Sequence, residues 1–190
     1  MRLYLVRHGE TEWAKARRHT GRTDVPLTPV GEDEARALGV RLASLSFDLV
    51  LSSPLQRALE TARLAGFGRR VQLTDELLEW DYGDYEGLTT PQIRARRPGW
   101  DLFRDGCPGG ESIEQVAERV RPLLAACTDA DEDVLLFAHG HLLRVLAACH
   151  LGLPLQAARH FFLGTASLSV AGMEHNWPAV LHWNDQGHLT

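Results

Sequence analysis

Short apolar runs alternate along this chain with longer amphipathic stretches, and this alternation constrains the fold more than any other feature. The runs at 2–7, 48–51 and 134–138 contain β-branched or aromatic residues and end in polar or glycine-containing turns, as buried strands do. Residues 70–73 form a weaker candidate strand. Strands separated by helices favour a mostly parallel central sheet covered on both faces. The sequence therefore predicts an α/β protein with a three-layer α/β/α architecture.

The last two apolar runs, at 166–172 and 179–183, flank a turn-like segment, EHNWP. This pattern predicts an antiparallel hairpin at one edge of the sheet. Trp177 and Trp183 on the hairpin are expected to be packing residues, and the hairpin is also the candidate surface for a homodimer.

Two amphipathic stretches in the first half of the chain carry helix-start signals. In 28–46, Thr28 is placed to cap the helix and a proline occupies the first helical position. In 53–66, Ser53 is the expected cap, and Gln56 lies where a capping box requires it.

Two further helices are predicted at 112–127 and 141–151. The first repeats the capping box, with Gln115 as its second member, and contains Pro122, which should bend or split the helix. No linker or repeat interrupts the chain, so residues 1–190 are expected to form a single domain.

Composition excludes several classes of protein. The chain has 190 residues, 44% of them hydrophobic and 24% charged, which is average for a globular domain and unlike a disordered chain. The net charge of −5 and the absence of a basic run argue against nucleic acid as a partner. No apolar run approaches the ~20 residues of a membrane span, and the first residues lack a signal-peptide pattern. We therefore expect a cytoplasmic protein with no membrane association.

The cysteines indicate neither a disulfide framework nor a thiolate metal site. There are three, an odd number, and they are far apart with no CxxC pair.

Residues 81–110 are the one long stretch of weak periodicity, rich in Gly, Pro, Arg and Trp. Long loops inside compact domains are often functional. We predict that this segment is a lid or a substrate-recognition segment.

The predicted parallel strands end in residues that carry chemistry. Arg7 and His8 close the first strand, Arg57 follows the second by about one helical turn, and His139 closes the third. Ligands of doubly wound sheets collect outside the carboxyl ends of the strands. Two histidines and two arginines would converge there, and such a cluster requires a strong anion, of which a phosphoryl group is the obvious example.

The segment Arg7-His8-Gly9-Glu10-Thr11 resembles the RHGE[ST] signature of the histidine phosphatase superfamily, which includes cofactor-dependent phosphoglycerate mutases. The resemblance covers nearly the whole chain, and 79–87 is most similar to a branch of small bacterial acid phosphatases and sugar-bisphosphate phosphatases. The other motifs that carry it are Thr20-Gly21, Leu27-Thr28-Pro29-Val30-Gly31, Ser52-Ser53-Pro54-Leu55-Gln56-Arg57-Ala58, Leu78-Glu79, Tyr82-Gly83, Glu86-Gly87, Pro108-Gly109-Gly110-Glu111-Ser112 and Ala138-His139-Gly140.

The resemblance implies a role for each catalytic position. His8 would be the nucleophile that forms a phosphohistidine, and Arg7, Arg57 and His139 would clamp the phosphoryl oxygens. Glu79 would protonate the leaving alkoxide and then activate water. Because the attacking ring nitrogen of His8 must be unprotonated, the other ring nitrogen should donate to a backbone carbonyl.

Substrate contacts are implied for Thr20, Gly21, Tyr82 and Gly140, the last through its backbone. The chain departs from the family where Asn often contacts phosphate, since Ala14 occupies that position. One phosphate hydrogen bond is therefore lost or supplied by another group.

The family includes hydrolases and mutases, and one interval favours hydrolysis. Mutases carry a longer insertion after the general-acid motif, with basic residues that hold the carboxylate of the substrate. Here that interval runs only from 81 to 107, and its candidates are Arg94, Arg96, Arg97 and Arg104. A shortened lid favours hydrolysis. The resemblance then implies a metal-independent phosphomonoesterase without cofactor, acting on small phosphorylated metabolites such as sugar or glycerate phosphates. The alternative is a 2,3-bisphosphoglycerate-dependent phosphoglycerate mutase.

Two hypotheses that assign the chain to other classes of protein remain open from the sequence. His139-x-His141 has a common zinc spacing, and with Asp81, Asp84 or Glu86 it would make a metallohydrolase. A phosphoprotein-binding module is the other reading, although binding alone needs neither His8 nor Glu79.

Overall fold

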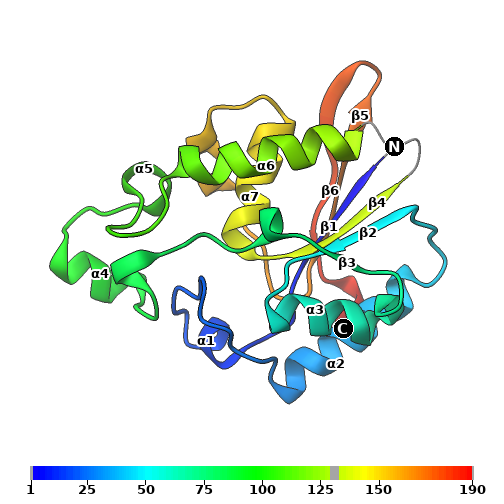
Figure 1. The fold of residues 1–190 in the computed structure, drawn as a ribbon, viewed down its shortest axis with the longest axis horizontal. Coiled ribbons are helices and arrows are strands. Elements are labelled where there is room, and N and C mark those ends of the chain that lie inside the picture. Colours follow the sequence, from blue (N-terminus) through cyan, green and yellow to red (C-terminus); the bar gives the residue numbers. More distant parts are fainter. Residues whose placement is uncertain (1, 129–132, 190) are drawn as a thin grey trace.

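The structure, a computed structural model, describes residues 2–128 and 133–189. One six-stranded sheet is flanked by helices, as predicted (Figure 1). The strands are β1 (Leu3–Arg7), β2 (Leu49–Ser52), β3 (Gln72–Leu73), β4 (Val134–Ala138), β5 (Leu168–Glu174) and β6 (Trp177–Asp185). The α-helices are α1 (Glu12–Lys15), α2 (Pro29–Leu42), α3 (Gln56–Ala62), α4 (Thr90–Arg96), α5 (Leu102–Asp105), α6 (Ile113–Thr128) and α7 (Gly140–His150).

The strand order is β3-β2-β4-β1-β5-β6. β1, β2, β3 and β4 are parallel to one another, whereas β5 is antiparallel to both β1 and β6. The mostly parallel sheet with an antiparallel edge is therefore confirmed. The parallel arrangement brings the carboxyl ends of β1, β2 and β4 to the same side of the sheet.

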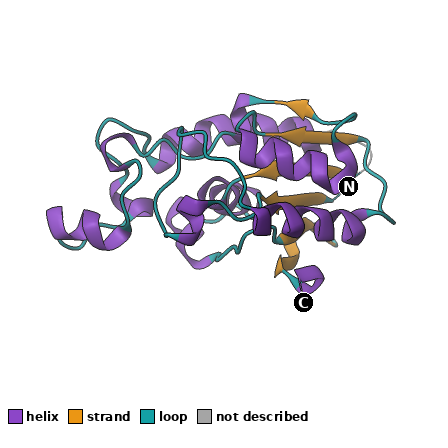
Figure 2. Cartoon of the chain, turned by 90° about the horizontal axis from the view of Figure 1, so that it is seen from below, coloured by secondary structure: helices purple, strands orange, loops and turns teal. Residues whose placement is uncertain are grey.

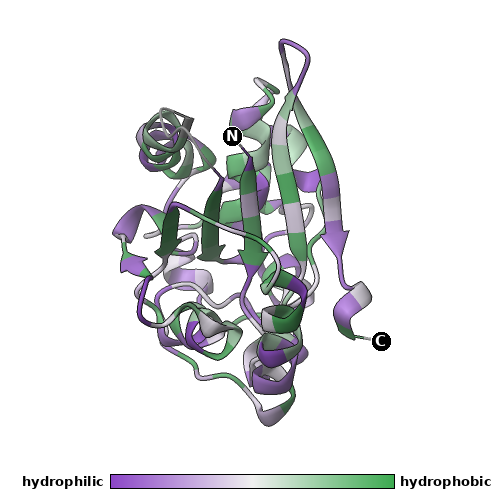
Figure 3. Ribbon diagram, turned by 90° about the vertical axis from the view of Figure 1, so that its right-hand side faces the viewer, coloured by the Kyte–Doolittle hydropathy of each residue, from purple (hydrophilic) through white to green (hydrophobic). Residues whose placement is uncertain are grey.

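Two apolar clusters cover the two faces of the sheet. Leu3 and Leu5 of β1 pack into the cluster that contains the buried side of α6 and α7, and Tyr4 and Val6 pack into the cluster that contains α2. This alternation follows from the two-residue period of a strand. The strands at the centre of the sheet are green in Figure 3, as expected for strands buried on both faces. No helix within the described residues is long and apolar enough to cross a membrane.

The capping predictions hold for some helices and fail for one. Thr28 caps α2 by accepting from Gly31 N, and the Ser112–Gln115 box is present. The box predicted at Ser53 is wrong, because α3 begins only at Gln56. The backbone N and the side chain of Gln56 both bond to Asp24, which removes Gln56 from that role.

Pro122 lies inside α6, which continues as one helix from Ile113 to Thr128. Pro122 therefore does not split this helix, and a bend at Pro122 stays a prediction. Proline lacks only one amide donor, and the packing of Val120, Leu123 and Leu124 into the core keeps the helix in place on both sides of it.

Residues 81–110 are more ordered than their weak periodicity indicates. They include α4 and α5, and the segment carrying these helices extends to one side of the sheet (Figure 2). Ile93, Trp100 and Phe103 are buried in the core cluster. Whether the segment acts as a lid stays a prediction.

The C-terminal hairpin separates its two tryptophans. Trp183 packs against Phe161 and donates from its indole N–H to the carbonyl of Phe162. Trp177 is 77% exposed, so its expected packing role is wrong. The homodimer expected at this surface stays a prediction.

Candidate active site

The three strand ends converge as predicted. Arg7 is in register with Ala138, and Ser52 with Phe137. The register continues beyond the strands, because His8 N donates to the carbonyl of Ala138 at 3.0 Å. The rings of His8 and His139 consequently meet edge to face, with centroids 5.3 Å apart.

His8 is buried and oriented by the backbone carbonyl of the next residue, Gly9. Its Nδ1 lies 2.7 Å from the carbonyl oxygen of Gly9, which can only accept, so Nδ1 carries the proton. Burial, followed by the charges of Arg57 and Arg7, lowers the pKa of His8 well below its ordinary value. The neutral ring therefore keeps Nε2 unprotonated, which is the tautomer a nucleophile requires.

The backbone after His8 is fixed by a contact between two glycines. Gly9 and Gly31 lie so close that a Cβ on Gly9 would overlap the carbonyl of Gly31, and a Cβ on Gly31 would overlap the carbonyl of Glu10. Gly9 N also donates to Thr61 Oγ1 at 3.0 Å. The N-terminus of α2 thus supports the turn that presents His8.

Arg57 is fully buried, and its guanidinium holds a loop. It donates to the carbonyls of Thr20, Gly21 and Thr23 at 2.9–3.1 Å. Burial lowers its pKa from the ordinary arginine value. The sequence predicts Thr20 and Gly21 as substrate contacts and Arg57 as a phosphoryl clamp. In the structure, hydrogen bonds from Arg57 connect all three residues.

Three buried nitrogens near His8 have no hydrogen-bond partner within the described residues: Nε of Arg7, Nε of Arg57 and Nδ1 of His139. Each side chain is otherwise anchored, Arg7 by the carbonyl of Leu163 at 2.6 Å and His139 by Ser53 Oγ at 2.8 Å. An unpaired buried polar nitrogen is costly, so three of them beside one imidazole match an anion-binding site.

Glu79 lies at the N-terminus of α7. Its Oε1 accepts from the backbone N–H groups of Trp80 (2.9 Å) and Leu142 (2.8 Å), and its Oε2 accepts from His141 N–H at 3.1 Å. Backbone donors and the positive end of the helix dipole both favour an anionic group at this place. Oε2 has one donor where Oε1 has two, and it therefore has the freer lone pair.

Tyr82 and His141 form a hydrogen-bonded pair that sequence reasoning did not foresee. Burial raises the pKa of Tyr82 and lowers the pKa of His141, so the phenol donates and His141 Nδ1 accepts, at 2.5 Å. His19 stacks on His141 with ring centroids 5.9 Å apart. The only signal in the sequence for a role of His19 is its position next to Thr20.

These groups surround a cavity of about 650 Å³. Among the predicted residues, those that line it are Arg7, His8, Thr20, Glu79, Tyr82 and Gly140. Arg57 and His139 lie behind this lining, and Gly21 is held by Glu86 through its backbone N–H. Ala14 also lines the cavity, whereas Arg17, Arg18 and Arg144 line it without having been predicted.

The zinc site of the alternative metallohydrolase hypothesis does not assemble. His139 bonds to Ser53 and His141 to Tyr82, so the two rings have separate partners. Within residues 2–128 and 133–189, no three His, Cys, Asp or Glu side chains are grouped so that they could hold a metal ion.

The family model of the histidine phosphatase superfamily (branch 1) matches residues 3–186. The chain belongs to the histidine phosphatase superfamily. An acid phosphatase of Mycobacterium tuberculosis is 44% identical over 178 residues, covering 92% of this chain and 87% of that protein. The sedoheptulose 1,7-bisphosphatase of Saccharomyces cerevisiae is 35% identical and covers 82% of this chain and 69% of its own length.

Mutase-named members of the superfamily are also similar. A protein named probable phosphoglycerate mutase GpmB from Salmonella choleraesuis is 36% identical, covering 94% of this chain and 88% of that protein. Among solved structures, that of an open reading frame of Mycobacterium tuberculosis superposes with a TM-score of 0.91 at 42% identity, covering 96% of both chains. These likenesses show the family and the fold of this chain.

Proposed function

We propose that this histidine phosphatase is a metal-independent phosphomonoesterase that hydrolyses small phosphorylated metabolites through a phosphohistidine at His8. The observation that carries the proposal is the state of His8: Nδ1 is held by a carbonyl and the neutral ring lines a cavity beside the unpaired nitrogens of Arg7 and Arg57. The names of the acid phosphatase and bisphosphatase relatives support the same reaction class.

In the first step, His8 Nε2 attacks phosphorus and the bond from phosphorus to the ester oxygen breaks. The transferring group carries its charge on three oxygens; Arg7 and Arg57 supply the neutralising charge and His139 a further hydrogen-bonding group. The backbone N–H of Gly140, at the start of α7, is a further donor available to the phosphoryl group.

Glu79 protonates the departing alkoxide from Oε2, the oxygen with the freer lone pair. In the second step the same oxygen takes a proton from water, which attacks the phosphohistidine and releases inorganic phosphate. The carboxylate left between these steps is stabilised by its three backbone donors.

Thr20, Gly21 and Tyr82 bind the substrate in this scheme. Arg57 couples the loop 20–23 to the phosphoryl site, because it donates to three carbonyls of that loop. Tyr82 lines the cavity and its hydroxyl is hydrogen-bonded to His141, so the phenol is held in one orientation in the cavity wall.

The alternative is a 2,3-bisphosphoglycerate-dependent phosphoglycerate mutase, which the name of the GpmB relative favours. A mutase must keep water from its phosphohistidine and must hold a carboxylate. None of Arg94, Arg96, Arg97 and Arg104, the carboxylate-binding candidates in the short interval, is among the residues that line the cavity. Hydrolysis is therefore the better-supported outcome.

The deciding experiment measures phosphate release and isomerisation with the same purified protein in the presence of EDTA. Sugar phosphates, phosphoglycerates and p-nitrophenyl phosphate are compared with the interconversion of 3- and 2-phosphoglycerate primed by 2,3-bisphosphoglycerate. Release without interconversion supports the proposal. Fast interconversion with little release would make the protein a mutase, and loss of all release on chelation would contradict the metal-independent mechanism.

A further inference from the structure

Two charged residues outside the cavity lining, Glu111 and Arg119, hold the main chain around Glu79. Glu111 lies just before α6, and Arg119 lies on that helix. Arg119 Nη2 donates to the carbonyl of Glu79 itself at 3.2 Å, and Nη1 donates to the carbonyl of Glu76 at 2.8 Å. One guanidinium therefore fixes the backbone that leads into the candidate general acid.

Glu111 holds the segment that follows Glu79. Its Oε2 accepts from the backbone N–H of Asp81 at 2.8 Å, and its own backbone N–H donates to the carbonyl of Asp81 at 2.9 Å. The indole N–H of Trp80 donates to the carbonyl of Glu111 at 2.9 Å. Because Trp80 and Asp81 come directly after Glu79, the chain is fixed on both sides of the acid.

Glu111 and Arg119 are joined to each other in a bidentate ion pair. Arg119 Nε lies 2.8 Å from Oε1 of Glu111, and Nη2 lies 3.1 Å from Oε2. The side chains of Arg119 and Glu111 are 18% and 16% exposed, so water and salt screen this pair less than a surface pair. Burial alone would raise the pKa of Glu111, but the hydrogen bonds from Arg119 and from Asp81 N–H outweigh it and lower the pKa. The carboxylate is therefore ionised, and a bidentate pair of this kind fixes geometry as well as charge.

Glu79 needs such support because it belongs to no helix or strand. Its carboxylate bonds to the backbone of Trp80, His141 and Leu142, but these bonds hold the end of a flexible side chain. A general acid must lie within hydrogen-bond reach of the leaving oxygen, and a misplacement of about 1 Å can cost about 10²-fold in rate. The position of the Glu79 main chain therefore matters for the reaction.

We propose that Arg119 and Glu111 are positioning residues for Glu79, and that their ion pair fixes the main chain of residues 76–81 so that the Glu79 carboxylate reaches the leaving oxygen. This inference rests on the proposed phosphatase function, because it concerns the acid of that reaction. Neither side chain lines the cavity, so their effect is confined to steps that need Glu79.

The test compares Arg119→Gln with the wild-type protein on two esters. One is the sugar or glycerol phosphate that the wild-type protein hydrolyses best, and the other is p-nitrophenyl phosphate. We expect kcat/KM to fall by about 10–10²-fold for the first ester and by less than about threefold for the second, whose leaving group barely needs a proton. The comparison uses kcat/KM because this ratio covers the steps up to release of the alcohol and excludes hydrolysis of the phosphohistidine.

A double variant separates positioning from a merely structural role. If Arg119 acts through Glu79, adding Arg119→Gln to Glu79→Gln should change kcat/KM for the alkyl ester by less than about twofold. Arg119→Lys keeps the charge but loses the planar fork, so it should recover only part of the wild-type rate. Glu111→Gln tests the pair independently if Arg119→Gln does not fold, and it should show the same selective loss.

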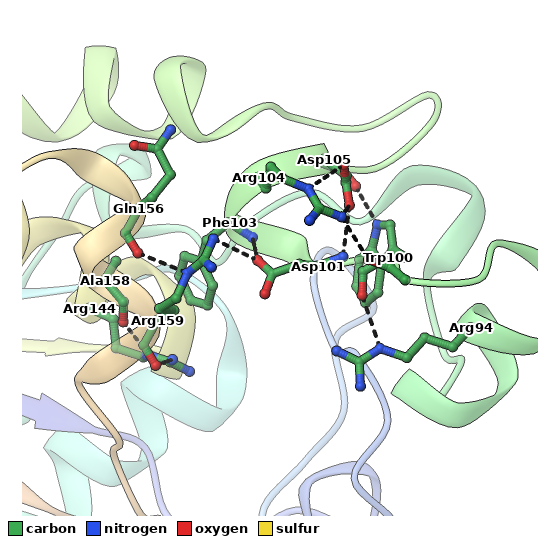
Figure 4. A network of polar contacts seen from close by, with 12 residues as sticks. Arg94, Trp100, Asp101, Phe103, Arg104, Asp105, Arg144, Gln156, Ala158 and Arg159 are labelled. Atoms are coloured by element: carbon green, nitrogen blue, oxygen red, sulfur yellow. Dashed lines mark hydrogen bonds and ion pairs between the residues drawn. The ribbon is translucent and has the colours of Figure 1, made fainter.

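Arg104→Gln is the matched control. Arg104 also forms a bidentate pair, with Asp105, and also donates to a backbone carbonyl, that of Gly99 (Figure 4). Within the described residues, this pair makes no hydrogen bond to residues 76–81. Arg104→Gln should therefore leave kcat/KM unchanged for both esters.

An equal loss on the two esters, or no loss on either, in both Arg119→Gln and Glu111→Gln would overturn the inference. A further loss on adding Arg119→Gln to Glu79→Gln would overturn it as well. In these cases hydrolysis by the wild-type protein would leave the proposed function intact. Absence of phosphate release from every ester by the wild-type protein would instead overturn the proposed function, and the inference with it.

Discussion

Leu142 donates its backbone N–H to Oε1 of Glu79 at 2.8 Å, so the candidate general acid is fixed to the first turn of α7. The two residues are 63 positions apart in the chain. The same helix begins at Gly140, beside Arg7, so one element positions both the carboxylate and a donor for the phosphoryl group. The acid and the nucleophile therefore keep a fixed separation without a direct bond between them.

Replacing Glu79 with Gln tests the role of this carboxylate. Esters with poor leaving groups, such as glycerol phosphates, should slow by about 10²–10⁴-fold, the range that general acid catalysis supplies. p-Nitrophenyl phosphate should slow far less, because its leaving group barely needs a proton. Steady-state kinetics on both esters measure the difference. Equal slowing of both would remove Glu79 from protonation of the leaving group.

Replacing His8 with Ala should abolish turnover of every ester while the fold is kept, since the attacking nitrogen is lost. Wild-type protein mixed with labelled ester and quenched in base should carry an acid-labile, base-stable phosphate, and His8→Ala should carry none. His160→Ala, at an exposed histidine, is the matched control and should keep full activity. Retained turnover in His8→Ala would end the nucleophile assignment.

Acidification should destabilise the protein through three histidines of the site, of which His8 and His139 are buried and His141 is half-buried. Burial is the largest cause that lowers the pKa of His8, His139 and His141 well below 6.5. In the unfolded chain they titrate near 6.5, so below that pH the unfolded state binds more protons. Their contribution is complete above pH 6.5. It is lost as pH falls, by about 1.4 kcal/mol per pH unit for each histidine.

Urea unfolding between pH 7.5 and 5 checks this expectation. Below pH 6.5, His141→Gln, which removes one of the three histidines, should show a slope shallower than wild type by about 1.4 kcal/mol per pH unit. An unchanged slope would mean that His141 is not neutral in the folded state.

Gly31→Ala should destabilise the protein and lower its activity together. The new methyl group would overlap backbone atoms of Glu10, two residues after His8, and backbone atoms yield less readily than side chains. We expect a loss of about 1–3 kcal/mol, the usual cost of overpacking, and a lower kcat. Gly68→Ala is the control, since its nearest neighbour is the flexible side chain of Arg63. Wild-type activity in Gly31→Ala would show that the turn tolerates movement.

The sequence predicts the sheet well because its strands are short apolar runs that end in recognisable turns. It predicts the convergence of Arg7, His8 and His139 for the same reason, since parallel strands must end on one side. It does not reveal the Tyr82–His141 pair or the bonds from α7 to Glu79, because these join segments about 60 residues apart.

Local sequence patterns also mislead at two places: the partner of Gln56, and the arginines that line the cavity. Gln56 fits a capping box locally, but Asp24 competes for it from another loop. Arg144 lies in a strongly apolar helical pattern and shows no sign of lining a cavity, whereas Arg94 and Arg104 lie in a loop where function is expected. Only the packing of Phe103 and the carbonyls of Ala158 and Arg159 around Arg144 distinguishes them.

The strand order has a consequence for how the protein unfolds on heating. β1 and β4, whose ends carry His8 and His139, occupy the middle of the sheet, and β3 and β6 form its edges. Local opening starts where few contacts hold the chain, at edges and termini, and the central strands open only with the whole molecule. Fraying of β3 leaves the reaction centre assembled. β6 differs, because its Trp183 and Asn184 hold the backbone of Phe162 and Gly164 on either side of Leu163, which anchors Arg7. Catalysis should therefore persist when β3 opens and end when β6 or the whole domain comes apart.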